Sequence, residues 1–276
     1  MIPAEFEYCA PDSLADAVGL LAEGGEDAKP LAGGHSLIPL MKLRLAFPSL
    51  LVDLRRVPGL TGVSRTDSSF VIGAMTTHSD VEHSPELGLL CRAAGTIADP
   101  QVRHRGTIGG SLVHGDPASD LPAVLLAAEG SLTVSGPDGE RTIGAADLFR
   151  DYMETSVAQG EIVTEVRLPA LDGWGYGYQK FNRRAEDWAM VAVSALVLAR
   201  DGVCEDVRIG LTNMGSTPLR ARAVEEALRG QPLDAERIAE AASHADEGTN
   251  PVGDLNATPE YKRHLARVMC RRALQE

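Results

Sequence analysis

Two short segments, each built around a pair of adjacent glycines, constrain this chain more than any other feature. The first has the sequence AGGHS at residues 32–36, and the second has TIGGS at residues 107–111, about 75 residues further on. Each follows an extended run and leads into a helix-like or tightly turned segment. Glycine pairs let a backbone approach a ligand and permit positive φ, so that neighbouring N–H groups can point at one anion. Two such segments favour a long ligand whose central diphosphate is held from both sides.

The chain up to residue 55 is predicted to form a small α/β unit. Asp12 or Ser13 can cap a helix over 14–23, which two glycines then stop. Residues 29–32 and 50–54 are typical of short buried strands. Between them, Ser36 can cap a helix over 37–44, in which Pro39 is tolerated because it lies in the first turn.

Residues 56–172 are predicted to form an α+β unit with mostly antiparallel strands. A Gly-Pro-Asp-Gly turn between two alternating runs is a strong hairpin signal. The expected strands are 62–64, 69–74, 132–135, 140–143 and 161–168, and the expected helices are 77–83, 87–97 and 123–129. Residues 103–120 are rich in glycine and have no apolar period, which favours an ordered loop on a rigid base.

Residues 173–276 are predicted to form a second α+β unit, which follows a glycine-rich joint at 172–178. Residues 191–198 and 203–211 are expected to pair as a hairpin around an Arg-Asp-Gly turn. Helices are expected over 220–229, 234–245 and 259–274. The last of these has Thr258 in the capping position and Pro259 at the first helical position, which is a favourable start.

Composition and spacing exclude several classes of protein. A net charge of -13 argues against nucleic-acid binding, which needs a basic face. The start of the chain has no leader-like pattern, and no apolar run approaches about 18 residues, so we expect a cytoplasmic protein without a transmembrane segment. The scattered cysteines and histidines lack metal-ligand spacing, so no metal site is expected. The usual nucleotide and nucleophile motifs are also absent, and we assign no catalytic acid, base or nucleophile.

Each candidate residue also has a purely structural interpretation. The first glycine pair can be a plain strand-to-helix turn. Asp120 can cap the following helix, or it can accept hydrogen bonds from ribose hydroxyls at the edge of a ligand. Lys180 lies in the basic run QKFNRR and can be a solvated side chain. Trp188 can form an aromatic wall for a ring system, although a buried core position is the default for tryptophan.

The order of these motifs resembles a known family. The segment AGGHSLIPLMKLR at 32–44, the run LVDL at 51–54, the second glycine pair and the run HGDPASD at 114–120 are together similar to the FAD-binding medium subunit of molybdenum hydroxylases. The nearest resemblance is to the carbon monoxide dehydrogenase type, and xanthine dehydrogenase carries a similar flavin domain. The resemblance extends over essentially the whole chain in the same order.

The resemblance implies a fold and a set of cofactor contacts. The fold is a PCMH-type, two-lobed FAD-binding domain with lobes at 1–55 and 56–172, followed by a C-terminal α+β domain of antiparallel strands and helices at 173–276. Two diphosphate-contacting segments, a flavin-contacting aspartate, an apolar backbone contact and a lysine near the flavin ring carry over from the family. The residues so assigned are Ala32, Gly33, Gly34, His35, Ser36, Thr107, Ile108, Gly109, Gly110, Ser111, Asp120, Val163 and Lys180.

The resemblance also implies electron relay within a hetero-oligomer, which could be a dimer of heterotrimers. An iron–sulfur small subunit would deliver electrons from [2Fe–2S] clusters, a molybdopterin large subunit would oxidise the substrate, and FAD here would reduce an external acceptor. Positive potential from main-chain amides and Lys180 would stabilise reduced flavin. A free-standing FAD-dependent oxidase or reductase is the alternative, and a subunit that has lost its flavin is another. Neither the substrate (carbon monoxide, an aldehyde or an N-heterocycle) nor the acceptor follows from this sequence.

Overall fold

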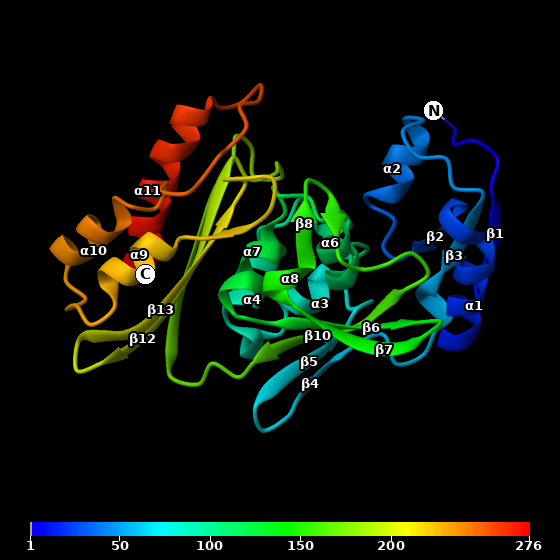
Figure 1. Cartoon of the computed structure of the whole chain (residues 1–276), viewed down its shortest axis with the longest axis horizontal. Coiled ribbons are helices and arrows are strands. Elements are labelled where there is room, and N and C mark those ends of the chain that lie inside the picture. The colour runs from blue at the N-terminus through cyan, green and yellow to red at the C-terminus, as the bar shows by residue number, and fades with distance from the viewer. Residues whose placement is uncertain (1) are drawn as a thin grey trace.

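The computed structural model describes residues 2–276 and shows three units in a row along the long axis of the molecule (Figure 1). The N-terminal unit lies at one end, the C-terminal unit lies at the other, and each unit has its own sheet. The fold is α+β, as the sequence predicts. Within residues 2–276, no helix has the length and apolar character needed to cross a membrane.

The N-terminal unit is a small parallel sheet with helices packed beside it. Its strand order is β1-β3-β2, and both outer strands run parallel to β3. Ser13 caps the first helix by accepting a hydrogen bond from the Asp16 N–H at 3.1 Å, as predicted. The elements are β1 (Glu7–Cys9), α1 (Leu14–Gly24), η1 (Gly25–Asp27), β2 (Ala28–Leu31), α2 (Leu37–Lys42), β3 (Leu50–Asp53) and η2 (Leu54–Arg56).

Asp53, from the run LVDL, has a structural role in this unit. Its side chain is completely buried at the end of β3. It accepts hydrogen bonds from the Tyr8 hydroxyl at 2.7 Å and from the Arg55 N–H at 2.9 Å. A buried carboxylate needs such partners, and here they join β1 to the turn that follows β3.

The middle unit is built on an antiparallel sheet with the strand order β4-β5-β10-β6-β7. Helices cover one face of this sheet (Figure 1). Ile72, Leu132 and Val166 of the sheet share a core with Ile108 and Leu121 of the helices. The elements are β4 (Val63–Arg65), β5 (Ser69–Gly73), α3 (His78–Glu82), η3 (Pro85–Leu87), α4 (Leu89–Ala94), α5 (Pro100–Arg103), α6 (Ile108–His114), α7 (Asp120–Ala127), β6 (Ser131–Gly136), β7 (Gly139–Gly144), α8 (Ala145–Leu148), β8 (Phe149–Asp151), β9 (Glu154–Thr155) and β10 (Ile162–Pro169).

The predicted hairpin is confirmed, and the expected strands at 62–64 and 69–74 pair with each other, but the predicted loop at 103–120 is wrong in part. Residues 108–114 form the helix α6, which Thr107 caps by accepting a hydrogen bond from the Gly110 N–H at 3.2 Å. Ile108 and Leu112, four residues apart, are both fully buried. Tertiary packing of this one apolar pair outweighs the poor helix propensity of two glycines.

The C-terminal unit is an antiparallel sheet with the strand order β11-β12-β13-β14 and three helices beside it. The predicted hairpin and the three predicted helices are confirmed. The predicted joint at 172–178 is wrong, because most of it belongs to the edge strand β11. The elements are β11 (Trp174–Phe181), β12 (Val191–Arg200), β13 (Val203–Thr212), β14 (Leu219–Arg220), α9 (Arg222–Leu228), α10 (Ala235–Ala242) and α11 (Pro259–Gln275).

The sheet of the C-terminal unit is buried on both faces. One face contributes Tyr178, Ala192 and Leu196 to the core of the middle unit. The opposite face contributes Val193 and Val207 to a second core, which the helices α9, α10 and α11 complete. The middle and C-terminal units therefore share one hydrophobic core, and their relative position is fixed by packing.

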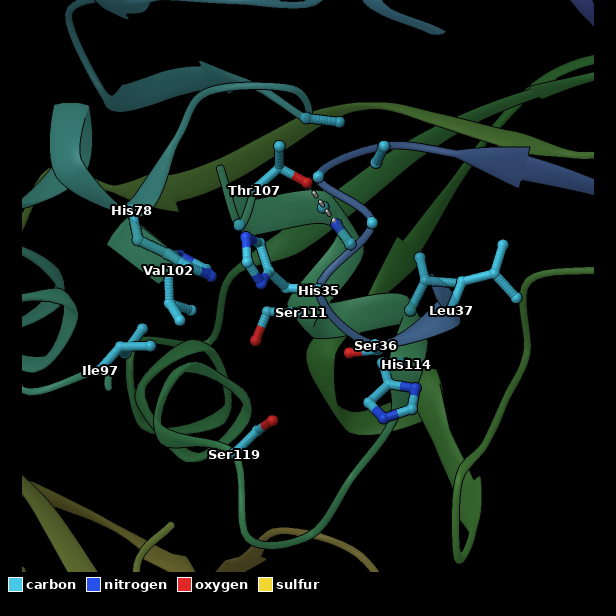
Figure 2. Close-up of a pocket in the computed structure, with 18 of the residues that line it drawn as sticks. His35, Ser36, Leu37, His78, Ile97, Val102, Thr107, Ser111, His114 and Ser119 are labelled. Atoms are coloured by element: carbon cyan, nitrogen blue, oxygen red, sulfur yellow. Dashed lines mark hydrogen bonds between the residues drawn. The ribbon is translucent and has the colours of Figure 1, made fainter. Parts of the chain in front are cut away.

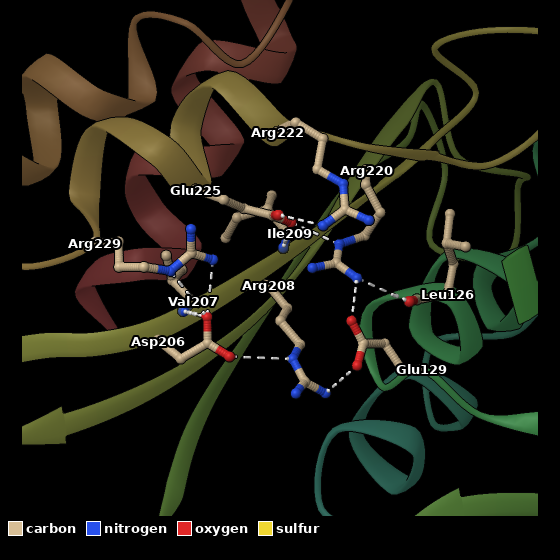
Figure 3. Close-up of polar contacts among 10 residues, drawn as sticks. All are labelled: Leu126, Glu129, Asp206, Val207, Arg208, Ile209, Arg220, Arg222, Glu225 and Arg229. Carbon is tan, nitrogen blue, oxygen red and sulfur yellow. Dashed lines mark hydrogen bonds and ion pairs between the residues drawn. The ribbon is translucent and has the colours of Figure 1, made fainter.

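A network of charged groups adds to this attachment at the end of α7 (Figure 3). The Arg220 guanidinium donates hydrogen bonds to the Leu126 carbonyl oxygen at 3.4 Å and to the Glu129 carboxylate at 3.3 Å. Arg208 pairs with the same carboxylate at 3.1 Å. Gly210 of β13 packs against the middle of α7. It lies so close to the Ala123 carbonyl that a Cβ at position 210 would collide with the oxygen.

We therefore expect Gly210→Ala to lower the free energy of unfolding by about 1–3 kcal/mol, because the added methyl group forces α7 away from β13. Gly175→Ala on β11 is the matched control, since a Cβ there meets no heavy atom nearer than 3.7 Å. The control should be neutral or slightly stabilising, by about 0.5 kcal/mol. Urea unfolding of the two variants tests this, and equal losses of stability would show that the close contact has no energetic role.

Candidate functional site

All three units contribute to a pocket of about 530 Å³. The N-terminal unit supplies residues 29–37, the middle unit supplies most of the remaining wall, and the C-terminal unit adds Lys180 and residues 186–188. A volume of this order is typical of pockets for small molecules and cofactors. Of the thirteen residues that the sequence singles out, twelve line this pocket, and the exception is Ile108.

The two glycine-paired segments meet at the pocket. A Cβ on Gly33 would collide with the carbonyl oxygen of Arg105 and would lie 2.8 Å from the Cα of Gly106. The backbone of the first segment therefore packs directly on the backbone that precedes the second. Only glycine allows this approach, so the first pair is more than a plain strand-to-helix turn.

The first segment presents unpaired main-chain donors. The N–H groups of residues 33–36 donate no hydrogen bond to any residue in the described part of the chain. Gly34 has a φ of 78°, a left-handed conformation that favours glycine. Ser36 occupies the capping position of α2, but its hydroxyl makes no capping bond and remains free. Adjacent free donors of this kind form an anion-binding concavity.

The second segment differs, because the N–H groups of residues 108–111 are already used within the fold. The N–H of Ile108 donates to the Thr76 carbonyl at 3.0 Å, and that of Gly109 donates to the Ala74 carbonyl at 2.9 Å. The Gly110 and Ser111 N–H groups donate to the Thr107 side chain and carbonyl. The expectation of a second free amide cluster is thus corrected. Ile108 in particular is a fully buried core residue, and the segment offers a ligand its glycine surface and the Ser111 hydroxyl.

Polar side chains without partners surround the same space (Figure 2). Six imidazole and hydroxyl side chains of the pocket wall make no side-chain hydrogen bond to another residue among 2–276. Burial lowers the pKa of His78 to about 4, and it also lowers the pKa of His114. These imidazoles are therefore neutral near pH 7, and they can donate or accept hydrogen bonds. The set comprises His35, Ser36, His78, Ser111, His114 and Ser119.

Asp120 and Lys180 form a buried ion pair at another part of the wall. The Lys180 Nζ lies 2.9 Å from Asp120 Oδ2 and 3.0 Å from the Thr96 carbonyl oxygen. The Tyr178 hydroxyl donates to Asp120 Oδ1 at 2.5 Å. Burial raises the pKa of Asp120, while the Lys180 ammonium and the Tyr178 hydroxyl act in the opposite direction. The side chain of Asp120 therefore serves this pair and does not cap α7.

The environments of Lys180 and Trp188 both differ from those that the sequence suggests by default, which are a solvated side chain for Lys180 and a buried core position for Trp188. The Lys180 side chain is only 5 % exposed, so it is no solvated basic residue. Trp188 is 56 % exposed and lines the pocket, so it is no core tryptophan. Val163 also lines the pocket, next to an irregularity where the pairing of β10 with β6 shifts register. The lining of the pocket thus includes an aromatic residue, an apolar residue and a neutralised ion pair.

Sequence reasoning missed several residues of the wall. His78, Ile97 and Val102 line the pocket although none belongs to a glycine-paired segment. Thr77 caps α3, which begins at His78, one residue after the start of the expected helix 77–83. The sequence thus predicts this helix closely, but nothing in the local sequence shows which way its first side chain points.

Comparisons with known proteins agree with this architecture. The family described as FAD binding domain in molybdopterin dehydrogenase matches residues 4–171, and the CO dehydrogenase flavoprotein C-terminal domain matches residues 176–276. The chain is 42% identical to the carbon monoxide dehydrogenase medium chain of Hydrogenophaga pseudoflava, over 99% of this chain and 97% of that one. It is 40% identical to subunit alpha of the 6-hydroxypseudooxynicotine dehydrogenase complex of Paenarthrobacter nicotinovorans, over 99% and 95%.

The similarity extends to solved structures. A structure of carbon monoxide dehydrogenase from Hydrogenophaga pseudoflava superposes with a TM-score of 0.97 at 44% identity, covering 100% of this chain and 98% of that chain. The three units of the present chain therefore have the same arrangement as in that relative.

The ion pair leads to a prediction about protonation. In Lys180→Met, Asp120 loses its counter-charge inside the protein, so its pKa should rise further and the carboxyl should take up a proton at neutral pH. Infrared spectroscopy would detect the protonated carboxyl as a new C=O band that disappears at high pH. Lys180→Arg, which keeps the charge, is the control and should show no such band. A carboxylate that stays ionised in Lys180→Met would contradict the burial argument.

Proposed function

This chain belongs to the family of FAD-binding medium subunits of molybdenum hydroxylases, and from that premise we propose that it relays electrons from partner subunits to an external acceptor. The chain is thus part of an oxidoreductase, and its cofactor is FAD. The finer assignment, in which iron–sulfur clusters of one partner supply the electrons and a molybdopterin partner oxidises the substrate, is part of the proposal. The division into lobes at 1–55 and 56–172 and a domain at 173–276 belongs to it as well.

One observation carries the proposal: four consecutive main-chain donors without partners, in residues 33–36, face a pocket that all three units line. A dinucleotide brings a pyrophosphate, whose oxygens only accept hydrogen bonds from such donors. The free hydroxyls of Ser36 and Ser111 and the pocket histidines add further donors. The residues present therefore fit FAD, and we assign residues 32–36 and 107–111 to the pyrophosphate, with Ile108 supporting them from the core.

The wall around Asp120, Val163, Lys180 and Trp188 suits the ring end of the cofactor. Val163 and the indole of Trp188 supply apolar surface for a flat ring system. The ion pair supplies polar groups of both signs with little net charge, since Lys180 and Asp120 neutralise each other. When bound, FAD accepts and releases electrons in both single and paired steps, and the protein's part is to bind, orient and tune it.

The relatives support the multi-subunit part of the proposal. They are named as a medium chain and as a subunit of a dehydrogenase complex, and their names refer to carbon monoxide and to 6-hydroxypseudooxynicotine. Similar medium subunits thus accompany chemically unrelated substrates. We infer that substrate choice resides in a partner subunit, and that this chain supplies a common route for electrons.

The native assembly provides the direct test of this function. The purified complex should show flavin absorption near about 370 and 450 nm and should contain molybdenum and iron. A substrate oxidised by the complex should bleach the flavin bands when no acceptor is present. Turnover by the isolated chain alone, with no metal-containing partner, would favour a free-standing oxidase or reductase and would contradict the relay.

Gly34→Ala should lower FAD affinity about ten-fold or more. An alanine is strained at a φ of 78°, so the donors of residues 33–36 would turn away from the pyrophosphate, and a lost charge-assisted hydrogen bond accounts for a factor of this size. Gly25→Ala is the matched control, because Gly25 has a φ of 57° and lies outside the pocket. Fluorescence titration of the FAD-depleted assembly measures both. Equal affinity losses in the two variants would contradict the assignment.

The ion pair makes a second prediction, for the reduction potential. In Lys180→Met, a protonated Asp120 leaves the local charge near zero at low pH, so the flavin potential should match that of the unmodified protein. At high pH the carboxylate ionises without a counter-charge, and the potential should fall. An uncompensated unit charge beside the ring, at an effective dielectric constant of about 20, lowers the potential by an amount on the order of tens of millivolts.

Spectroelectrochemical titration at pH 6 and pH 9 tests this expectation on the assembled complex. The difference between variant and unmodified protein at each pH is the measured quantity, so the intrinsic pH dependence of flavin cancels. Identical potentials at both pH values would show that the ion pair has no influence on the cofactor.

A further inference from the structure

His78 is a buried imidazole with no hydrogen-bond partner at either ring nitrogen among residues 2–276. The residue is 5 % exposed and lines the pocket. Its Nδ1 is completely enclosed and has no partner. The ring extends from the first position of α3 toward His35 (Figure 2). Because Nδ1 is closed off by protein, Nε2 is the ring nitrogen that can meet a ligand.

The protein is built to accommodate this ring. The backbone N–H of His78 donates to the Gly106 carbonyl at 2.9 Å, which fixes the start of α3 against the residue that precedes the second glycine-paired segment. A Cβ on Gly106 would lie 2.7 Å from His78 Cδ2, so a glycine there leaves room for the imidazole. A buried polar ring without partners is costly in the free protein, and an apolar ring of the same shape would avoid that cost. Such a group is explained most simply by a partner that the ligand supplies.

The surroundings keep this imidazole neutral. A proton on Nδ1 would be enclosed without an acceptor, and burial lowers the pKa of His78 to about 4. The other ionisable groups that act on the ring are His35 from the first segment and Arg103 from α5, and both oppose a further positive charge. Arg103 is held by Glu82, with Nε 2.7 Å from the carboxylate. On α3 itself, Asp80 is engaged with Thr77 at the cap.

We propose that His78 contacts the dinucleotide as a neutral imidazole, with its Nε2–H donating a hydrogen bond to the anionic centre of the cofactor. The inference rests on the proposed FAD site and adds a contact that lies outside the two glycine-paired segments. The enclosed Nδ1 selects the tautomer that carries its proton on Nε2, because that tautomer leaves only a lone pair unpaired inside the protein. The same ring nitrogen then points a single donor at the ligand over the whole physiological pH range.

Two variants of His78 separate this role from a structural one. His78→Phe keeps the ring shape and removes both nitrogens, so the thermal midpoint of the FAD-free protein should stay the same or rise. FAD affinity of the FAD-depleted assembly should fall by about ten-fold to a hundred-fold. His78→Gln offers an amide N–H in place of Nε2–H and should recover part of the affinity.

His83→Phe is the matched control. His83 ends the same helix, lies outside the pocket, and has its Nδ1 2.7 Å from the Ser79 carbonyl oxygen. This variant should lose stability and keep its FAD affinity, which is the opposite of the pattern expected for His78→Phe. The ratio of dissociation constants for His78→Phe and the unmodified protein should also stay constant between pH 6 and pH 8.

Three other outcomes would each overturn part of this proposal or the proposed function. Unchanged FAD affinity in His78→Phe would overturn the contact while leaving the proposed function intact. A ratio that shrinks as the pH rises from 6 to 8 would show a protonated imidazole and would overturn the neutral donor. Failure of the unmodified assembly to bind FAD at all would refute the proposed function itself, and the contact with it.

Discussion

The backbone of Gly33 lies against the backbone of Arg105 and Gly106, and the pocket depends on this contact. Any side chain at position 33 would push the N-terminal unit away from the middle unit, because the atoms opposite it are main chain and cannot turn aside. The contact also explains why the two glycine-paired segments differ. The N–H groups of residues 33–36 are free, whereas those of residues 108–111 are used within the fold, directly after the backbone on which the first segment rests. In the proposed site, the first segment supplies the main-chain donors and the second supports it.

The helix α7 gives the C-terminal unit a direct influence on the pocket. Lys180 and Tyr178 of β11 hold Asp120 at its first residue, and Arg220 holds the Leu126 carbonyl near its end. Between these points the helix packs on β13 at Gly210. The C-terminal unit thus fixes both ends of an element whose first residue lines the pocket, which makes this unit part of the framework of the pocket. A loosely attached module could not hold a buried ion pair at 2.9 Å across a unit boundary.

Local patterns predicted the elements well and the contacts less well. Caps such as Ser13, Thr77 and Thr258 mark helix starts correctly because a cap is a bond between near neighbours in the chain. The strand β11 was missed because its glycines look like a flexible joint. In the structure Gly177 instead lets α11 pack closely on that strand. The contact joins residues that are far apart in the sequence, so no short stretch of sequence reveals it. For the same cause the sequence could not show that Lys180 meets Asp120, sixty residues earlier, or that Ile108 points into the core.

Polar side chains without protein partners gather along the wall of the pocket. Elsewhere in the fold, buried carboxylates such as Asp53 and Glu225 have several partners each. Along the pocket wall, six hydroxyl and imidazole side chains have no partner among residues 2–276, and Gly34 adopts a conformation that few other residues tolerate. The enclosed Nδ1 of His78 has a particular cost, since an unpaired buried group loses stability that an apolar substitute would recover. His78 lines the same pocket as the glycine pairs, so the cost falls where the free main-chain donors also lie, and the two observations support the proposed site by separate physical arguments.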